Sequence, residues 1–239
     1  MTGPSRATPG PVLEVSDVTH AFGDGEQRRV VLRDVSVRLT ERRIGIVGAN
    51  GSGKSTFVRL LNGLVRPTSG TVTVNGLDTR RHGREVRRQV GFCFTDPDAQ
   101  IVMPTVREDV AFGLRRRGLS KSEVARLVET VLEQYGLADH IDHPAHLLSG
   151  GQKQMLALAS VLVTEPTVLV LDEPTTLLDL RNAAAVARHL AALPQQVLLV
   201  THHLDLLEGY DRVLVFDVGR LVHDGTPDEA LAFYRKLMR

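Results

Sequence analysis

The chain has 239 residues, of which 42% are hydrophobic and 24% charged, and its formal net charge is +1. This balance is typical of a globular α/β protein, and without an overall basic field nucleic acid is not an expected partner. Cys93 is the lone cysteine and is expected in the core, and no apolar run approaches the ~20 residues that span a bilayer, so any membrane link must run through a partner.

The N-terminal part of the chain predicts an arm followed by a β-rich region. Residues 1–11 lack the apolar stretch of a secretory signal and are expected to form a disordered arm. Apolar and polar residues then alternate at 12–18 (VLEVSDV) and 31–39 (VLRDVSVRL). This pattern predicts two half-buried strands with a polar turn at 23–27 between them.

The next segment predicts a strand, a helix and a second strand. An apolar strand at 44–47 runs into a glycine-rich loop, and a helix is expected at 55–64. The alternating residues 70–75 (GTVTVN) predict a strand that is closed by an Asn-Gly turn. Residues 80–88 carry five arginines, and two interpretations stay open: a solvated helix face, or a docking surface for an acidic partner.

From about residue 96 to 164, helical periodicity replaces the strand patterns, as at 122–135, where Ser122 is the expected N-cap. Farther along, an apolar helix is expected at 183–193. Apolar strand patterns return three times, at 168–171, 197–201 and 213–216. Buried strands that alternate with helices predict an α/β fold with a mainly parallel sheet, into which the helical segment 96–164 is inserted.

The glycine-rich loop GANGSGKS fits the phosphate-loop pattern G-x-x-x-x-G-K-[ST] and lies between a strand and a helix. Its backbone N–H groups are expected to point at phosphate oxygens, with Lys54 at the β- and γ-phosphates and Ser55 at Mg²⁺. ATP and Mg²⁺ are therefore the expected ligands. The residues expected to bind nucleotide here are Gly48, Ala49, Asn50, Gly51, Ser52, Gly53, Lys54, Ser55 and Thr56.

Three polar residues follow the ends of predicted strands. Asp172 ends the run VLVL and is expected to hold Mg²⁺, directly or through water. Glu173 beside it is the expected base or orienter of the attacking water, a helix-start charge being the alternative. His202 closes another strand and is expected to contact the γ-phosphate, although a histidine taken alone is more often structural.

A second anion site is predicted at 148–152 (LSGGQ), which precedes an apolar helical run. Ser149 offers a hydroxyl, Gly150 and Gly151 offer unobstructed backbone N–H groups, and Gln152 completes the motif. Because the chain already has a phosphate loop, this site is expected to serve a nucleotide held by another copy or by a partner.

Phosphate loop, LSGGQ, LDEP and strand-end histidine, in this order and spacing, resemble the ATP-binding subunit of an ABC transporter over residues 12–239. The resemblance implies a RecA-like core, an N-terminal antiparallel β subdomain and a helical signature subdomain at about 96–164. It also implies a second ATPase subunit, identical or paralogous, so that two ATP molecules lie between phosphate loop and signature segment. Phe22 matches the aromatic residue that stacks on adenine, and 176–179 match the D-loop.

Thr95 occupies the position of a glutamine that, in the family, touches Mg²⁺ and senses the membrane subunit. The threonine hydroxyl is expected to approach Mg²⁺ but has a shorter reach than a glutamine amide. Our hypothesis is that Thr95 weakens metal or water positioning without abolishing ATP binding. Gln100 is not expected to take its place, because a related FQNPDxQ frame carries both glutamines.

Residues 97–114 (PDAQIVMPTVREDVAFGL) resemble energy-coupling-factor ATPases, which drive uptake of vitamins, nickel or cobalt with a transmembrane coupling subunit and a substrate-binding membrane subunit. Residues 39–56 and the short C-terminal tail most resemble the biotin-type ATPase. An importer ATPase, peripheral on the cytoplasmic face of the membrane, is therefore expected.

Two alternatives stay open: a conventional ABC importer or exporter subunit, and a soluble ABC ATPase. Soluble chromosome and repair types insert long coiled coils between the phosphate loop and the signature segment. Here only 95 positions, without a heptad run, separate Lys54 from Ser149. This spacing favours the transporter class.

Overall fold

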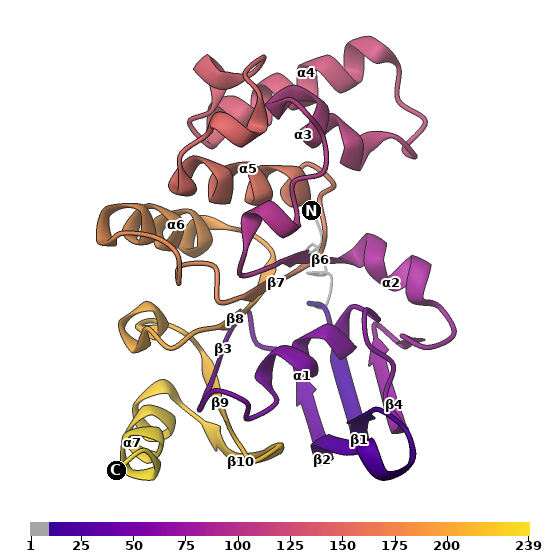
Figure 1. Cartoon of the computed structure of the whole chain (residues 1–239), viewed down its shortest axis with the longest axis vertical. Helices are drawn as coiled ribbons and strands as arrows, with labels where there is room; N and C mark the ends of the chain where they lie inside the picture. Colours follow the sequence, from indigo (N-terminus) through magenta and orange to yellow (C-terminus); the bar gives the residue numbers. More distant parts are fainter. Residues whose placement is uncertain (1–9) are drawn as a thin grey trace, which may run out of the picture.

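The computed structural model of the chain describes residues 10–239, so most of the expected arm at 1–11 lies outside the described part. Residues 10–239 form two sheets surrounded by helices (Figure 1). A four-stranded sheet has the order β2-β1-β4-β5, and a six-stranded sheet has the order β10-β9-β3-β8-β7-β6 within this described part.

The smaller sheet is antiparallel and contains the predicted N-terminal strands. β1 (Leu13–Phe22) pairs with β2 (Arg29–Leu39) and with β4 (Ser69–Val74), which turns back into β5 (Leu77–Asp78). The two residues of the expected Asn-Gly turn have φ angles of 49° and 80°. Both lie in the left-handed region, as a tight two-residue hairpin turn requires.

The larger sheet has a parallel core and carries the predicted phosphate-loop strand. Its strands are β3 (Arg43–Gly48), β6 (Val90–Cys93), β7 (Val168–Asp172), β8 (Gln196–Val200), β9 (Arg212–Asp217) and β10 (Arg220–Gly225). Among these described strands, only the pairing of β10 with β9 is antiparallel. Every residue of β3, β7 and β8 is buried, because both faces of the sheet are covered.

Seven α-helices and five short 3₁₀ helices connect these strands in the described part. The α-helices are α1 (Lys54–Leu61), α2 (Gly83–Gln89), α3 (Val106–Leu114), α4 (Lys121–Gln134), α5 (Gly150–Leu162), α6 (Leu180–Ala192) and α7 (Pro227–Leu237). The 3₁₀ helices are η1 (Gly25–Gln27), η2 (Pro97–Ala99), η3 (Ala138–His140), η4 (Ala145–Leu147) and η5 (Leu204–Leu207). Among the described residues, no helix combines the length and hydropathy needed to cross a bilayer.

The predicted helical insertion stands above the sheets in Figure 1 as α3, α4 and α5. All regular elements between β6 and β7, a fully described stretch, are helices. The expected N-cap of α4 was wrong by two residues: Ser120, not Ser122, begins the helix. The Ser120 hydroxyl accepts the backbone N–H of Glu123, whose carboxylate accepts the N–H of Ser120, and this capping box fixes the helix start.

Two hydrophobic cores lie on opposite faces of the larger sheet. Along β7, Leu169 and Leu171 belong to one core, whereas Val168 and Val170 belong to the other. The first core is covered by α3 to α7, and the second by α1, α2 and the smaller sheet. The parallel sheet is thereby packed between two apolar layers, which hold the ends of its strands in place.

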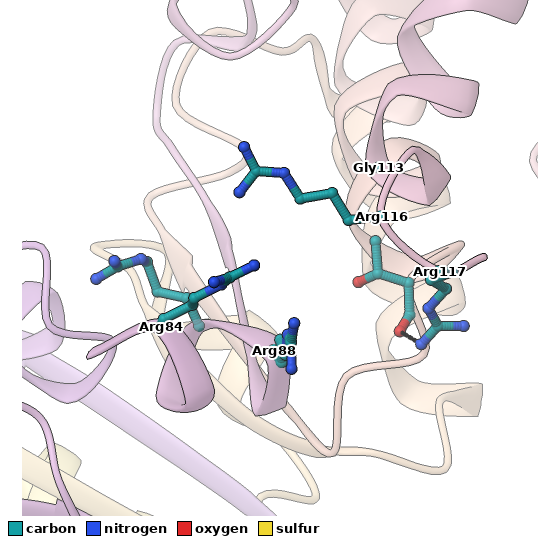
Figure 2. A pocket seen from close by; sticks show the side chains of 7 residues that line it. Arg84, Arg88, Gly113, Arg116 and Arg117 are labelled. Carbon is teal, nitrogen blue, oxygen red and sulfur yellow. Dashed lines mark hydrogen bonds between the residues drawn. The ribbon is translucent and has the colours of Figure 1, made fainter. Parts of the chain in front are cut away.

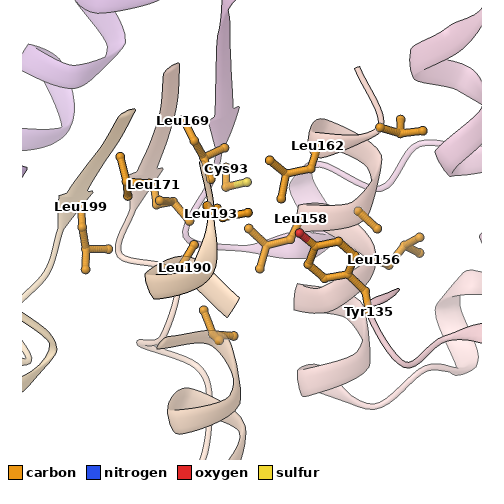
Figure 3. Packing of buried hydrophobic residues seen from close by; sticks show 14 of the residues in the cluster. Cys93, Tyr135, Leu156, Leu158, Leu162, Leu169, Leu171, Leu190, Leu193 and Leu199 are labelled. Atoms are coloured by element: carbon orange, nitrogen blue, oxygen red, sulfur yellow. The ribbon is translucent and has the colours of Figure 1, made fainter. Parts of the chain in front are cut away.

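Cys93 lies in the first core, as expected from the sequence. Figure 3 shows its thiol near the β7 leucines, across from Leu158 and Tyr135. Burial raises the pKa of the Cys93 thiol to about 12. A thiol with so high a pKa stays protonated and serves packing rather than nucleophilic chemistry.

Candidate nucleotide-binding site

Strands β3, β7 and β8 run parallel, so their carboxyl ends meet at one edge of the sheet. Asp172, the last residue of β7, pairs with Val200, which in turn pairs with Ile46 of β3. The phosphate loop follows β3 at this edge, and α1 begins at Lys54. The fold thus brings together three predicted motifs that are far apart in the sequence.

At its last residue, the phosphate loop requires a glycine, because the backbone is left-handed there and a side chain would clash. Gly53, the residue before α1, has a φ of 103°. A Cβ atom there would lie 2.8 Å from a methyl carbon of Leu32 and 2.9 Å from the carbonyl oxygen of Val31. The loop therefore packs tightly against β2, and this close approach opens the N-terminus of α1 towards a ligand.

Lys54 is held over the loop by hydrogen bonds to the loop itself. Its ammonium donates to the carbonyl oxygens of Gly48 (2.8 Å) and Ala49 (3.0 Å). Burial lowers the pKa of the lysine, and the nearby carboxylates of Glu173 and Asp172 act in the opposite direction. The cation is thus nearly buried and positioned beside the backbone N–H groups that a phosphate would meet.

Asp172 and Ser55, the two predicted Mg²⁺ ligands, lie in contact, and we call this place the metal edge. The Ser55 hydroxyl donates to Oδ1 of Asp172 at 2.9 Å, and Arg59 contacts Oδ2 at 3.3 Å. Burial raises the pKa of the Asp172 carboxyl, while the Ser55 hydrogen bond and the Arg59 charge lower it. A hydroxyl beside a carboxylate suits Mg²⁺, which prefers oxygen ligands and retains water. Among the described residues, no group of three or more histidine, cysteine or acidic side chains is arranged to hold a metal ion.

Sequence reasoning missed Arg59 at this edge. Arg59 lies four positions after Ser55 on α1, so both side chains emerge on the same helix face. That spacing is the signal that identifies Arg59 as a second partner of Asp172. The guanidinium offsets part of the cost of burying the carboxylate.

Thr95 lies beside the metal edge but bonds to backbone. Its hydroxyl donates to the carbonyl oxygen of Asp172 at 2.7 Å. Gln100 makes different contacts, because its Oε1 accepts the N–H of Phe94 (3.1 Å) and its amide donates to the carbonyl of Ala157 on α5 (3.0 Å). Gln100 thereby ties the end of β6 to the helix that carries the LSGGQ segment, a contact that nothing in the sequence pattern signals.

Glu173 and His202 meet at the same edge. The backbone of Glu173 is left-handed, with φ of 57°, and its N–H donates to the carbonyl of Val200 at 3.0 Å. One carboxylate oxygen accepts from the Thr176 hydroxyl (2.9 Å) and contacts Nδ1 of His202. Since a non-glycine residue pays about 1–3 kcal/mol for such a backbone, the turn is held by its surroundings and aims the carboxylate.

A cleft of about 410 Å³ brings part of the predicted site together. Its lining includes Phe22, Lys54, Ser55, Thr56 and Glu173, whereas Asp172, Thr95 and His202 are not among the described lining residues. The Phe22 ring is half exposed and lies edge-to-face on His20, with ring centroids 4.5 Å apart. An exposed apolar ring in the lining of the cleft suits the stacking of a nucleotide base.

The LSGGQ segment lies elsewhere. Ser149 caps α5: its hydroxyl accepts the N–H of Gln152 (3.3 Å), whose amide oxygen accepts the N–H of Ser149 (2.9 Å). Ser149 and Gly150 are exposed, whereas Gly151 packs so closely on Asn182 that a Cβ there would lie 2.5 Å from the asparagine Oδ1. None of the five residues 148–152 is among the described residues that line the 410 Å³ cleft. The cleft and the LSGGQ segment are therefore separate sites within one chain.

Known proteins share this chain's motifs and fold. The family model described as ABC transporter matches residues 32–176. An ABC transporter ATP-binding protein of Deinococcus radiodurans is 54% identical, covering 95% of this chain and 99% of the relative. The biotin transport ATP-binding protein BioM of Rhizobium etli is 51% identical over 87% of this chain and 93% of that protein.

The solved structure of cbiO1 from Clostridium perfringens, part of the ABC transporter complex cbiONQ, has the same fold. It matches with a TM-score of 0.80 and 30% identity, covering 94% of this chain and 93% of that chain. The chain therefore belongs to the ABC transporter family and is an ATP-binding and ATP-hydrolysing transporter subunit. The predicted α/β fold with a RecA-like core, and ATP as ligand, are confirmed.

Proposed function

We propose that this ATPase energises an energy-coupling-factor importer for a vitamin, biotin being the first candidate, or for nickel or cobalt. The observation that carries the proposal is the segment 97–114, together with 51% identity to a biotin transport ATP-binding protein. The partners would be a transmembrane coupling subunit and a substrate-binding membrane subunit, with this chain peripheral on the cytoplasmic face.

The roles of the site residues follow from the geometry of the cleft. The phosphates of ATP lie along the loop against Lys54, and the base stacks on Phe22. Ser55 and Asp172 would hold Mg²⁺, which neutralises phosphate charge when bound, with Thr95 beside them. Glu173 orients the attacking water and takes its proton as the bond from the γ-phosphorus to ADP breaks. Nδ1 of His202 contacts Glu173, so the other ring nitrogen, Nε2, would contact the γ-phosphate.

The exposed Ser149 and Gly150 would contact a nucleotide that lies in the cleft of a second subunit, not the one in their own chain. In one chain they lie away from the cleft, and their hydroxyl and N–H groups carry no charge. Neutral donors at a helix N-terminus suit a γ-phosphate presented by a facing chain. Two ATP molecules would then lie between two ATPase subunits, identical or paralogous, and hydrolysis would loosen the pair.

The decisive experiment is purification of the chain from its own membranes, with identification of the proteins retained. We expect a multi-spanning coupling subunit and a small substrate-binding membrane protein. Vesicles containing the complex should accumulate labelled biotin, Ni²⁺ or Co²⁺ only with ATP. A complex that instead exports, or that needs an external binding protein, would support the conventional ABC transporter alternative. A chain that retains no membrane protein would contradict the proposal.

A further inference from the structure

Two clusters of nitrogen-bearing side chains lie outside the nucleotide cleft. One is a groove of about 510 Å³ lined by five arginines, from 84–88 and 116–117 (Figure 2). A guanidinium stays protonated and offers no lone pair, so these arginines cannot ligate a metal ion. The other cluster consists of His140 and His143, whose ring nitrogens can. We call these two residues the histidine pair.

The histidine pair lies between α4 and the LSGGQ segment, and two of its ring nitrogens face each other. Nδ1 of His140 is 2.9 Å from Nδ1 of His143, and the ring centroids are 4.9 Å apart. His140 is half-buried, whereas His143 is exposed, so an ion in solution can reach the His143 side chain directly.

The other nitrogen of His140 is bound to the LSGGQ segment, and this contact fixes the position of the ring proton. The amide oxygen of Gln152 accepts the N–H of Ser149 at 2.9 Å, so the amide nitrogen faces Nε2 of His140, at 2.7 Å. Because an amide nitrogen only donates, Nε2 of His140 accepts. In the neutral ring the proton is then on Nδ1, which donates to Nδ1 of His143.

We propose that the histidine pair binds a divalent transition-metal ion through its two Nδ1 atoms, with water in the remaining coordination positions. Two bonds of ~2.1 Å at a right angle place the ligand nitrogens about 3.0 Å apart, whereas a tetrahedral angle places them about 3.4 Å apart. The observed 2.9 Å therefore favours an ion with square-planar or octahedral geometry, such as Ni²⁺, over Zn²⁺.

A neighbouring carboxylate favours a cation at the histidine pair. Asp142 lies close enough to His143 for the charge on one side chain to act on the other. Its Oδ1 accepts from Nε of Arg107 at 2.9 Å, so this carboxylate already has a partner and is not counted as a third ligand. The protein would thus supply two imidazoles, and water the rest.

Metal binding would change the contact between His140 and Gln152. A neutral imidazole that binds an ion through Nδ1 carries its proton on Nε2, which then faces the amide NH₂ of Gln152. Two donors cannot share one hydrogen bond, so the amide must turn its oxygen towards His140. The N–H of Ser149 then loses its acceptor, and one half of the capping box at the start of α5 opens.

The ion would therefore act on the exposed Ser149 and Gly150, and we expect it to slow ATP hydrolysis. This effect rests on the proposed function, in which Ser149 and Gly150 contact a nucleotide of a second subunit. Binding of the ion to the histidine pair does not rest on it, so the two claims are measured separately.

The first measurement is calorimetric titration of the untagged full chain with NiCl₂, without nucleotide. His143→Gln removes one of the two protein ligands and should lower the affinity for Ni²⁺ roughly tenfold or more, since even loss of an outer-shell partner costs that much. His146→Gln, at an exposed histidine outside the pair, is the matched control and should bind Ni²⁺ as the wild type does.

A second variant should change the affinity in the opposite direction. In Gln152→Glu, a carboxylate can accept from both the N–H of Ser149 and Nε2–H of a metal-bound His140, so the conflict between donors disappears. This variant should bind Ni²⁺ more tightly than the wild type, and adding His143→Gln should abolish the gain. Equal affinities of the wild type and His143→Gln, or no gain in Gln152→Glu, would overturn the proposed ion site.

ATP hydrolysis is then measured with Ni²⁺ added at a fixed, saturating concentration of MgATP. The wild type should be inhibited at lower Ni²⁺ concentrations than His143→Gln, because inhibition through displaced Mg²⁺ is common to both proteins. If calorimetry shows the ion site but both proteins are inhibited alike, the histidine pair binds metal and its effect on the proposed composite site is wrong.

Discussion

The phosphate-loop cleft and the LSGGQ segment are both anion sites at helix N-termini, yet they are built differently. In the cleft region, hydrogen bonds fix each functional group: Ser55 bonds to Asp172, which is 117 positions away, whereas Lys54 bonds to carbonyls of its own loop and Glu173 to the nearby Thr176. In the LSGGQ segment, Ser149 is bonded only within its own helix cap and remains exposed. The first is preorganised by contacts within this chain, and the second is an exposed helix N-terminus.

The two regions also differ in charge. The cleft buries a lysine and an aspartate whose pKa values are shifted in opposite directions by burial, and each offsets the shift of the other. The LSGGQ segment presents only neutral donors. Desolvating neutral groups costs far less than desolvating charges, so under the proposed function the LSGGQ segment would bind and release a nucleotide at a low desolvation cost.

The largest expected effect comes from a substitution in the cleft, at Glu173. Glu173→Gln should lower the ATP hydrolysis rate by roughly a hundredfold or more, because the amide cannot take a proton from water. ATP binding should persist, and an ATP-bound pair of subunits should accumulate on gel filtration. Glu133→Gln, an exposed change on α4, is the matched control. Near-normal turnover by the Glu173 variant would show that Glu173 does not take the proton of the attacking water.

The next prediction joins the two regions across subunits. Lys54→Met inactivates the cleft, and Ser149→Asp keeps a good helix cap while placing a negative charge against the γ-phosphate. Each variant alone should be almost inactive. If identical chains pair, an equal mixture should recover about a quarter of wild-type activity, since half of the dimers contain one sound composite site of two.

The neutral variant Ser149→Asn is the control for that mixture, because it caps the helix without the repelling charge. It should keep most of the activity on its own. Absence of any recovery in the mixture would show that two copies of this chain do not complete each other, and would point to a paralogous partner.

A smaller effect is expected at Thr95, where the cleft departs from its family. Thr95→Gln should raise the hydrolysis rate severalfold and lower the Mg²⁺ concentration for half-maximal activity, because the longer amide reaches the metal edge. Thr95→Val keeps the side-chain shape but removes the hydrogen bond to the Asp172 carbonyl. Comparing the two variants distinguishes the effect of a longer side chain from the effect of losing this hydrogen bond. Unchanged ATPase and transport rates in the glutamine variant would contradict the hypothesis.

The smallest effect concerns His20, which packs edge-to-face against Phe22 of the cleft lining. Burial lowers the pKa of His20 below 6.5, whereas the unfolded chain binds the proton at its ordinary pKa. Stability should therefore fall as pH drops below 6.5, by at most about 1.4 kcal/mol per pH unit from this residue. His20→Phe should flatten the pH dependence of the urea midpoint between pH 7 and about pH 5. Identical slopes for both proteins would show that His20 is not buried in its neutral form.

Local motifs were predictable and long-range partners were not. The phosphate loop, the LSGGQ cap and the strand ends depend on neighbouring residues, so their patterns are visible in sequence. β6 and β10 escaped prediction because β6 is four residues long and β10 carries polar side chains on an edge. The contact of Gln100 with Ala157 joins residues 57 positions apart, and no periodicity records it.

Gly151 shows how information can pass between two such chains. Its missing side chain lets the start of α5 rest directly on Asn182, near the start of α6, which follows the turn that carries Glu173. If two subunits pair as proposed, a shift of that turn in one subunit would be transmitted through Asn182 to the exposed Ser149 and Gly150. Nucleotide binding and hydrolysis at one site would then depend on the state of the other site, so the two sites would not act independently.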